Sequence, residues 1–173
     1  SKGERYMAIK IENRLFQIET EHTSYQMKVD KYGVLTHLWY GAKTECSMDY
    51  LLDYPDVGFS GNIYEAENQR TYSLNTLPQE YSTSGVGDFR IPAITVTHDD
   101  GSRALDLRYS GHKISRGKYN IDGLPAVYAT EEEAETLEIV MEDTATNIEV
   151  ILMYGGLPKK DIITRSTVII NNG

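Results

Sequence analysis

Apolar and polar residues alternate with a period of two along much of this chain, and that pattern restricts the folds open to it. Between Thr23 and Asp30, for example, Tyr25, Met27 and Val29 share one face. Successive side chains of a β-strand point to opposite sides, so this alternation is typical of strands with one buried face. A helical period is almost absent. The pattern therefore predicts an all-β fold.

Comparable runs recur along the chain, separated by turn signals such as 99–102, where Gly101 can take a positive φ. About eight short strands at this spacing are typical of an antiparallel β-sandwich or barrel. Strands are expected at residues 14–20, 23–30, 34–40, 91–98, 103–109, 135–142, 147–154 and 162–170.

Residues 41–90 are expected to be mostly irregular, with room for one short helix or strand. Gly, Pro, Asn, Ser and Asp accumulate there, and the apolar periodicity fades. A connection of this length without regular structure is uncommon in a compact domain unless it is functional. Because binding residues often lie on such segments, we expect the function to depend on this one.

Net charge and cysteine content indicate which classes of partner are disfavoured and which cellular compartment is expected. The 17 Lys and Arg residues are outnumbered by 26 Asp and Glu residues, giving a net charge of −9. This balance argues against a nucleic-acid or anionic-membrane partner, since both need a concentrated basic face. No apolar run approaches the ~18 residues of a membrane span. The single cysteine, Cys46, can form no internal disulfide, which favours the reducing cytoplasm.

The two ends of the chain carry signals of their own. Residues 1–6 are interpreted as a disordered leader, and Met7 offers a natural start. Residues 171–173 are typical of a hairpin turn, yet no strand follows them. We therefore expect residues 7–173 to be the first part of a domain that continues in the natural chain.

The residues alone predict no catalytic, metal-binding or cofactor-binding constellation. A Gly-x-Ser-x-Gly nucleophile elbow is absent, and the four histidines lack the paired spacing of metal ligands. Residues 85–88 begin like a phosphate-binding glycine loop, but Arg90 occupies the third glycine position. Paired carboxylates, which a glycosidase holds on a rigid scaffold, stay open as a hypothesis. The acidic residues considered for it are Asp49, Asp53, Asp56, Glu65, Glu67, Glu80 and Asp88.

A longer stretch carries a family resemblance. Residues 79–83 read Gln-Glu-Tyr-Ser-Thr, residues 87–90 read Gly-Asp-Phe-Arg, and residues 163–166 read Ile-Thr-Arg-Ser. In these motifs and their order, the sequence resembles the N-terminal domain of bacterial α-galactosidases of glycoside hydrolase family 36. The resemblance runs from about Met7 to the end of the chain.

The resemblance implies a fold and an activity. Family members have an N-terminal β-supersandwich of the galactose-mutarotase-like type, then a catalytic (β/α)₈ barrel and a small β domain. They cleave terminal α-1,6-linked galactose, as in melibiose and raffinose, with retention of configuration. The barrel, which holds both catalytic carboxylates, has no counterpart in this sequence. The resemblance therefore carries over no catalytic residue, metal ligand or cofactor, and this chain alone is expected to be inactive.

The resemblance also implies partners for residues 41–90. In tetrameric bacterial relatives, loops of the N-terminal domain reach the mouth of a neighbouring subunit's barrel. The implied partners are therefore α-galactoside sugars, the chain's own barrel and the other subunits of a homo-tetramer. The candidates for substrate contact are Arg70, Tyr81, Asp88 and Arg90. Asp88 and Arg90, two residues apart, share a face of an extended chain, so they can instead brace the loop internally.

Two other functions remain open. The thirteen tyrosines suit half-buried strands, but their rings can also cover the face of a sugar, as in a free-standing carbohydrate-binding β-sandwich module. An oligomerisation domain without ligand contact is the second alternative. A reading frame that continues past Gly173 into a barrel selects the enzyme domain, whereas a stop codon there selects the module.

Overall fold

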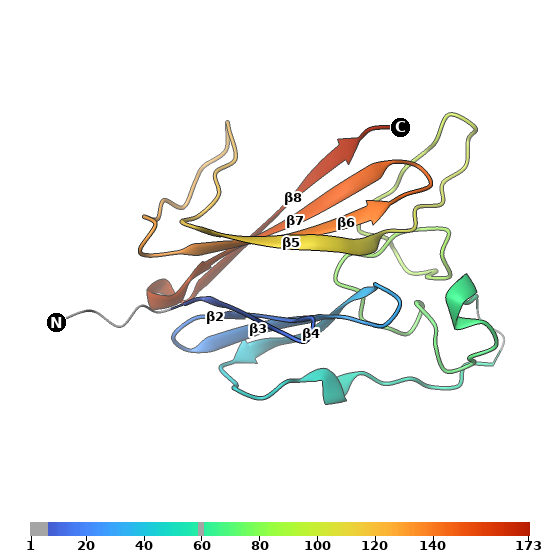
Figure 1. The fold of residues 1–173 in the computed structure, drawn as a ribbon, viewed down its shortest axis with the longest axis horizontal. Coiled ribbons are helices and arrows are strands. Elements are labelled where there is room, and N and C mark those ends of the chain that lie inside the picture. Colours follow the sequence, from blue (N-terminus) through green and yellow to red (C-terminus); the bar gives the residue numbers. More distant parts are fainter. Residues whose placement is uncertain (1–6, 59–60) are drawn as a thin grey trace.

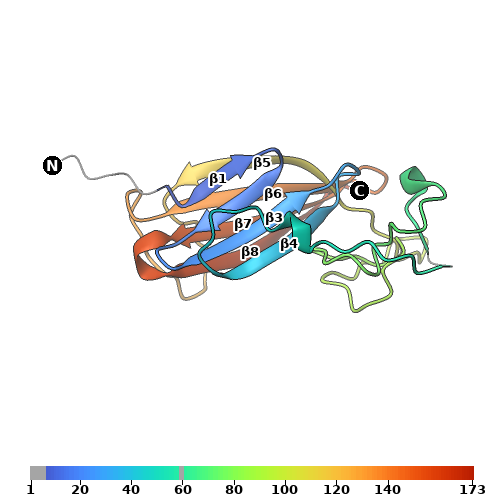
Figure 2. The same cartoon turned by 90° about the horizontal axis from the view of Figure 1, so that it is seen from below.

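The computed structural model describes residues 7–58 and 61–173, so the expected leader at residues 1–6 lies outside the described residues. Two antiparallel sheets of four strands each face one another (Figure 1). Turned by 90°, the strands of one sheet lie over those of the other (Figure 2). The predicted all-β sandwich is confirmed.

Each sheet consists of consecutive strands, and within each sheet every strand pairs antiparallel with the next one along the chain. The first sheet contains β1 (Ile9–Glu12), β2 (Leu15–Glu19), β3 (Thr23–Val29) and β4 (Leu35–Ala42). The second contains β5 (Arg108–Arg116), β6 (Glu135–Asp143), β7 (Ile148–Leu157) and β8 (Ile162–Asn171). Residues 43–107 connect the sheets, and much of this connection lies beyond one end of the sandwich (Figure 2).

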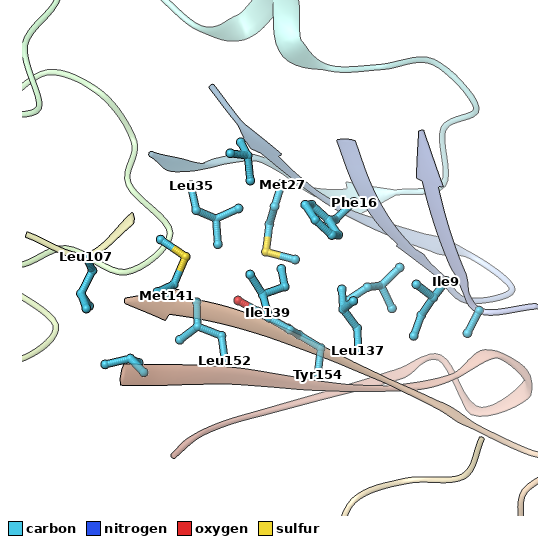
Figure 3. Packing of buried hydrophobic residues seen from close by; sticks show 14 of the residues in the cluster. Ile9, Phe16, Met27, Leu35, Leu107, Leu137, Ile139, Met141, Leu152 and Tyr154 are labelled. Carbon is cyan, nitrogen blue, oxygen red and sulfur yellow. The ribbon is translucent and has the colours of Figure 1, made fainter. Parts of the chain in front are cut away.

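The hydrophobic core lies between the facing sheets. Phe16 and Met27 of the first sheet point toward Leu137, Ile139 and Leu152 of the second (Figure 3). Each of these side chains is at most 1% exposed. Fully burying such a side chain contributes about 1.5–3 kcal/mol, so this layer holds the two sheets together.

The alternation located most strands but missed two. Six expected segments, at 14–20, 23–30, 34–40, 135–142, 147–154 and 162–170, coincide with β2, β3, β4, β6, β7 and β8. Strand β1 has only four residues, too few for a clear pattern. Strand β5 is polar or half-exposed along its length and lies at the edge of its sheet, so it lacks an apolar face.

The hairpin expected from residues 91–98 and 103–109 is wrong. Its turn forms, with His98 N donating to Ser102 O at 2.9 Å. Beyond the turn, the carbonyl of Ala104 hydrogen-bonds the imidazole Nε2 of His98 at 2.8 Å. It therefore bonds to a side chain where a hairpin ladder would supply a backbone N–H. Leu105 N donates to Ser84 O at 3.1 Å. The two arms therefore bond to another segment of the chain instead of forming a ladder with each other.

The segment predicted to be irregular, 41–90, begins with the last two residues of β4, and its described residues from 43 on are irregular, as predicted. These described residues contain two 3₁₀ turns, η1 (Asp49–Leu51) and η2 (Tyr64–Ala66). A third, η3 (Pro158–Lys160), follows β7. The irregular segment also has a small core of its own. Its buried members are Val34, Ile63, Ala66, Tyr72, Leu74 and Leu77. Because this core packs at the end of the first sheet, the segment has a fixed shape without regular structure.

A histidine–carboxylate pair links the turn between β2 and β3 to the start of β8. His22 N donates to Asp161 Oδ1 at 2.8 Å, and His22 Nδ1 lies 2.6 Å from Oδ2. Hydrogen bonding with Asp161 raises the pKa of His22 above its ordinary value. The same bond lowers the pKa of Asp161 to about 2. The pair therefore links the two sheets at one end, and it is an ion pair when His22 is protonated.

Replacing Asp161 by asparagine is expected to return the pKa of His22 toward about 6.5. Asparagine tolerates the left-handed backbone of Asp161, whose φ is 51°, so only the charge changes. In the unmodified chain, His22 stabilises the fold below its unfolded-state pKa, and this contribution is lost as the pH rises through its raised pKa. NMR titration of the His22 ring measures the change, and half-buried His98, which hydrogen-bonds Ala104 and not Asp161, serves as the internal control.

Candidate functional site

The carboxylate of Glu80 is buried between the two sheets, with 1% of its side chain exposed. Tyr25 of β3 and Tyr154 of β7 donate their hydroxyls to Oε1 at 2.6 and 2.8 Å. His37 Nδ1 of β4 lies 3.0 Å from Oε2 and donates to it. Arg165 Nη2 of β8 lies 3.1 Å from Oε1 and also donates to the Glu80 carbonyl, at 2.9 Å. One side chain is thus held by four strands, two from each sheet.

The charge state of this cluster follows from burial and pairing. Burial acts to raise the pKa of Glu80, but the His37 hydrogen bond and the Arg165 charge outweigh it and hold that pKa below its ordinary value. Burial, with the adjacent Glu80 charge, raises the pKa of Tyr25 and Tyr154. The carboxylate is therefore an ionised acceptor, and the phenols remain donors.

The structure brings the predicted pair Asp88 and Arg90 into direct contact. Asp88 Oδ1 accepts from the backbone N and the Nε of Arg90, at 3.0 and 2.9 Å. Asp88 Oδ2 accepts from Arg90 Nη2 and Gln79 Nε2, both at 2.8 Å. Both carboxylate oxygens are therefore occupied within the loop. These bonds, against the effect of burial, lower the pKa of Asp88.

Arg90 also binds the backbone of residues 74–77, earlier in the same loop. Its Nη2 donates to the carbonyls of Leu74 and Leu77 at 2.8 and 2.7 Å. Its Nη1 takes part in none of these bonds, and 47% of the side chain is exposed. Arg90 therefore braces the loop with one edge of its guanidinium and presents the other edge outward.

The other two predicted site residues lie in different surroundings. Arg70 Nε pairs with Asp56 Oδ1 at 3.1 Å, and both side chains are largely exposed. Tyr81 is half-buried and packs against the main core, and burial raises the pKa of its phenol. Of the four candidates, the structure thus joins only Asp88 and Arg90.

Beside this pair runs an open groove of about 750 Å³, lined mainly by residues 61–65 and 84–90. Tyr64 and Phe89, which line it, are 94% and 80% exposed, and Ile91, two residues after Phe89 in the chain, is 95% exposed. Exposed aromatic rings beside charged side chains suit contact with a sugar or with another protein surface. The groove therefore adds apolar contact area to the charged edge of Arg90.

In the sequence, Glu80 stands among the acidic side chains of 41–90 and within the motif at 79–83, but sequence reasoning predicted no buried cluster around this residue. Its partners are between 43 and 85 residues away along the chain. A signal was nevertheless available, because Tyr25 and Tyr154 occupy apolar faces of predicted strands. A buried phenol needs a polar partner for its hydroxyl.

Within the described ranges, 7–58 and 61–173, none of the helical segments has the length and apolar character of a membrane span. The same ranges contain no group of three or more His, Cys, Asp or Glu side chains placed to hold a metal ion.

Comparisons with known proteins agree with the fold. Residues 33–173 match a family model described as the glycosyl hydrolase family 36 N-terminal domain. The bifunctional alpha-galactosidase/sucrose kinase AgaSK of Mediterraneibacter gnavus is 51% identical over 160 residues, which are 92% of this chain and 17% of that protein.

Solved structures place the similarity at the level of the whole sandwich. The galactosidase domain of AgaSK has a TM-score of 0.92 and 50% identity, over 96% of this chain and 23% of that one. A doubly substituted variant of the alpha-galactosidase AgaA of Geobacillus stearothermophilus, in complex with raffinose, has a TM-score of 0.85 and 40% identity, over 92% of this chain and 22% of that one. This chain spans less than a quarter of the length of these relatives. It belongs to the glycoside hydrolase family 36 N-terminal domain family.

Proposed function

We propose that this chain is the non-catalytic N-terminal domain of a retaining α-galactosidase acting on terminal α-1,6-galactose in melibiose- and raffinose-type oligosaccharides. The observation that carries the proposal is 51% identity over nearly the whole chain to a protein named as an alpha-galactosidase, of which the match covers 17%. The chemistry then belongs to a barrel outside these 173 residues. The single exposed cysteine, Cys46, supports a cytoplasmic enzyme.

The 173-residue chain, prepared alone, is expected to release no leaving group from a chromogenic α-galactoside. The catalytic carboxylates of a retaining glycosidase must lie ~5 Å apart on a rigid scaffold, and the barrel would supply them. The measurement is absorbance against a buffer blank, with the full-length enzyme as the positive control. Release above the blank by the purified chain would contradict the proposal.

We further propose that residues 61–65 and 84–91 support oligomerisation and line the active-site mouth of a neighbouring subunit. The exposed Tyr64, Phe89 and Ile91 supply apolar contact area, and the outward edge of Arg90 can donate charge-assisted hydrogen bonds to sugar hydroxyls. Arg70, Tyr81 and Asp88 remain candidates with it. Because both oxygens of Asp88 already accept hydrogen bonds, its geometry favours the bracing role.

Truncation of Arg90 to alanine in the full-length enzyme is expected to lower kcat/KM about ten- to a hundredfold. Loss of one charged hydrogen bond costs about 1.5–3 kcal/mol, which gives that range. Steady-state kinetics and light scattering together measure the effect and the integrity of the oligomer. The exposed Arg103, changed to alanine, is the matched control.

The outcome separates substrate contact from bracing. An intact oligomer with unchanged kinetics in both Arg90→Ala and Asp88→Ala would remove these residues from the site. A lower melting temperature or a broken oligomer, with unchanged kinetics in the remaining enzyme, would assign them to bracing. The chain would then be an oligomerisation domain without ligand contact.

The exposed rings beside the groove also support the second candidate, a free-standing carbohydrate-binding module. In that case the chain alone would bind galactose or raffinose, and calorimetry would report heat that Phe89→Ala abolishes. Absence of heat with the chain alone, together with raffinose hydrolysis by the full-length protein, would favour the enzyme domain.

A further inference from the structure

Hydrogen bonds of two adjacent residues, Gln79 and Glu80, join the sandwich to the Asp88–Arg90 pair, and the Glu80 carboxylate is the buried one of these contacts. Glu80 N donates to the carbonyl of Leu35 in β4 at 3.0 Å. The preceding residue, Gln79, forms an isolated β-bridge with Thr36. Gln79 Nε2 then donates to Asp88 Oδ2 at 2.8 Å. Two adjacent residues thus connect both sheets to the loop that carries Arg90.

The register of residues 77–80 also sets the position of the Arg90 guanidinium. Two of its acceptors are the carbonyls of Leu74 and Leu77, just upstream of Glu80 in the chain. Leu74 and Leu77 are themselves buried, at 3% and 0% exposure. A shift of this stretch along β4 would therefore move Arg90 together with its acceptors.

The polar composition of the cluster around Glu80 indicates a role other than packing the core. A buried carboxylate is costly unless hydrogen bonds fully satisfy it, and an apolar residue of similar volume often stabilises as well or better. Here Tyr25, His37, Tyr154 and Arg165 converge from four strands on one carboxylate. Such directional bonds allow one placement of Glu80, whereas apolar packing tolerates several.

We propose that Glu80 is a positioning residue, which fixes segment 74–91 against the sandwich and thereby sets where Arg90 and the exposed Phe89 are presented. The expected effect of Glu80 on the placement of segment 74–91 is independent of the proposed function. The expected effect of Glu80 on the kinetics rests on the proposed role of this loop at a neighbouring subunit's active-site mouth.

The attachment of segment 74–91 to the sandwich through Glu80 depends on the ionised Glu80 carboxylate. The titratable and charged groups facing it are Tyr25 of β3, His37 of β4, Tyr154 of β7 and Arg165 of β8, and Tyr40 lies against the Tyr25 ring. A protonated Glu80 would keep only part of its capacity to accept these donors. Pairing lowers the pKa of Glu80 in the fold. The hydrogen bonds to its carboxylate are therefore fully formed above that pKa and weaken as the pH falls through it.

The test is hydrogen exchange of the intact full-length protein, followed by mass spectrometry of peptides from 74–91 and from β6 and β7. Glu80→Gln is expected to speed exchange in 74–91 at least about tenfold more than in β6 and β7, as loss of a charged hydrogen bond implies. The control is Glu19→Gln, which makes the same change at a buried carboxylate that pairs with Lys10 at 2.9 Å. It should leave exchange in 74–91 unchanged.

A milder pair of variants keeps the test valid if Glu80→Gln fails to fold. Tyr25→Phe removes one hydroxyl donor, whereas Tyr40→Phe removes a hydroxyl from a residue that is 59% exposed and paired with Tyr25 across the strands. Only Tyr25→Phe should speed exchange in 74–91 selectively. Equal acceleration in 74–91, β6 and β7 for both Glu80→Gln and Tyr25→Phe would overturn the proposal, because Glu80 would then only stabilise the fold.

Two further readouts separate positioning from stability. Protection of 74–91, corrected for intrinsic exchange, should fall in acid in the unmodified protein. Protonation of Glu80 and of Asp88, whose pKa is also lowered, both contribute, so the fall should be smaller in Glu80→Gln. A fall of the same size in Glu80→Gln would overturn the assignment, because Asp88 alone would then account for it. In kinetics, Glu80→Gln should raise KM with kcat retained. Selective loosening of 74–91 with unchanged KM would support the positioning role and contradict the proposed substrate contact instead.

Discussion

Phe16→Ala is expected to lower the free energy of unfolding of this chain by about 3–5 kcal/mol. The ring is 1% exposed in the layer between the sheets. It also reaches β5, where it lies 6.0 Å from the Tyr109 ring and 5.3 Å from the His112 ring, centroid to centroid. Removing it leaves a cavity that sheets on both sides cannot close. Urea unfolding followed by circular dichroism measures the loss.

Phe89→Ala is the matched control, because it deletes the same ring from a residue that is 80% exposed. Surface substitutions of this kind usually change stability by less than about 0.5 kcal/mol. Similar losses in the two variants would mean that the layer around Phe16 does not hold the sandwich together.

Gly85→Ala is expected to cost about 2–5 kcal/mol, through two separate effects. Gly85 has a φ of +85°, a conformation that costs other residues about 1–2 kcal/mol. An added Cβ would also lie 2.6 Å from both Cα and Cβ of Ala104. The overlap with backbone adds about 1–3 kcal/mol of overpacking. The movement would disturb Leu105, which is 1% exposed in the main core.

Gly101→Ala separates the two effects. Gly101 has nearly the same φ, +82°, but an added Cβ would meet nothing within 4 Å. Its expected cost is therefore the backbone part alone, about 1–2 kcal/mol. Thermal and urea unfolding of both variants give the difference, and equal losses would show that the close approach of Ala104 relaxes freely.

The strands that could be predicted are those whose side chains divide into a buried and an exposed face. In β7, Val150, Leu152 and Tyr154 alternate with half-exposed residues, and the pattern alone located it. The same reasoning failed for residues 91–98, where Ile94 and Val96 pack on the core although the backbone forms no ladder. Alternation reports which side chains are buried, and it does not report which backbone groups pair.

For the candidate site, too, only the contact between residues close in sequence could be predicted. Contact between Asp88 and Arg90 could be predicted, because two residues of separation in an extended chain place side chains on one face. The cluster around Glu80 could not, because its donors come together only when two sheets are stacked in one particular register. Local spacing contains no information on that stacking.

Within each sheet, every strand pairs with its neighbour in sequence, and this has a consequence for the order of folding. Each sheet can form from local contacts, which close short loops and are reached quickly. Joining the sheets requires closure of the connection between β4 and β5, and only then can the Tyr25 and Tyr154 hydroxyls meet the same carboxylate. The contacts of Glu80 therefore belong to the final docking step. They would slow unfolding while leaving the rate of strand pairing unchanged.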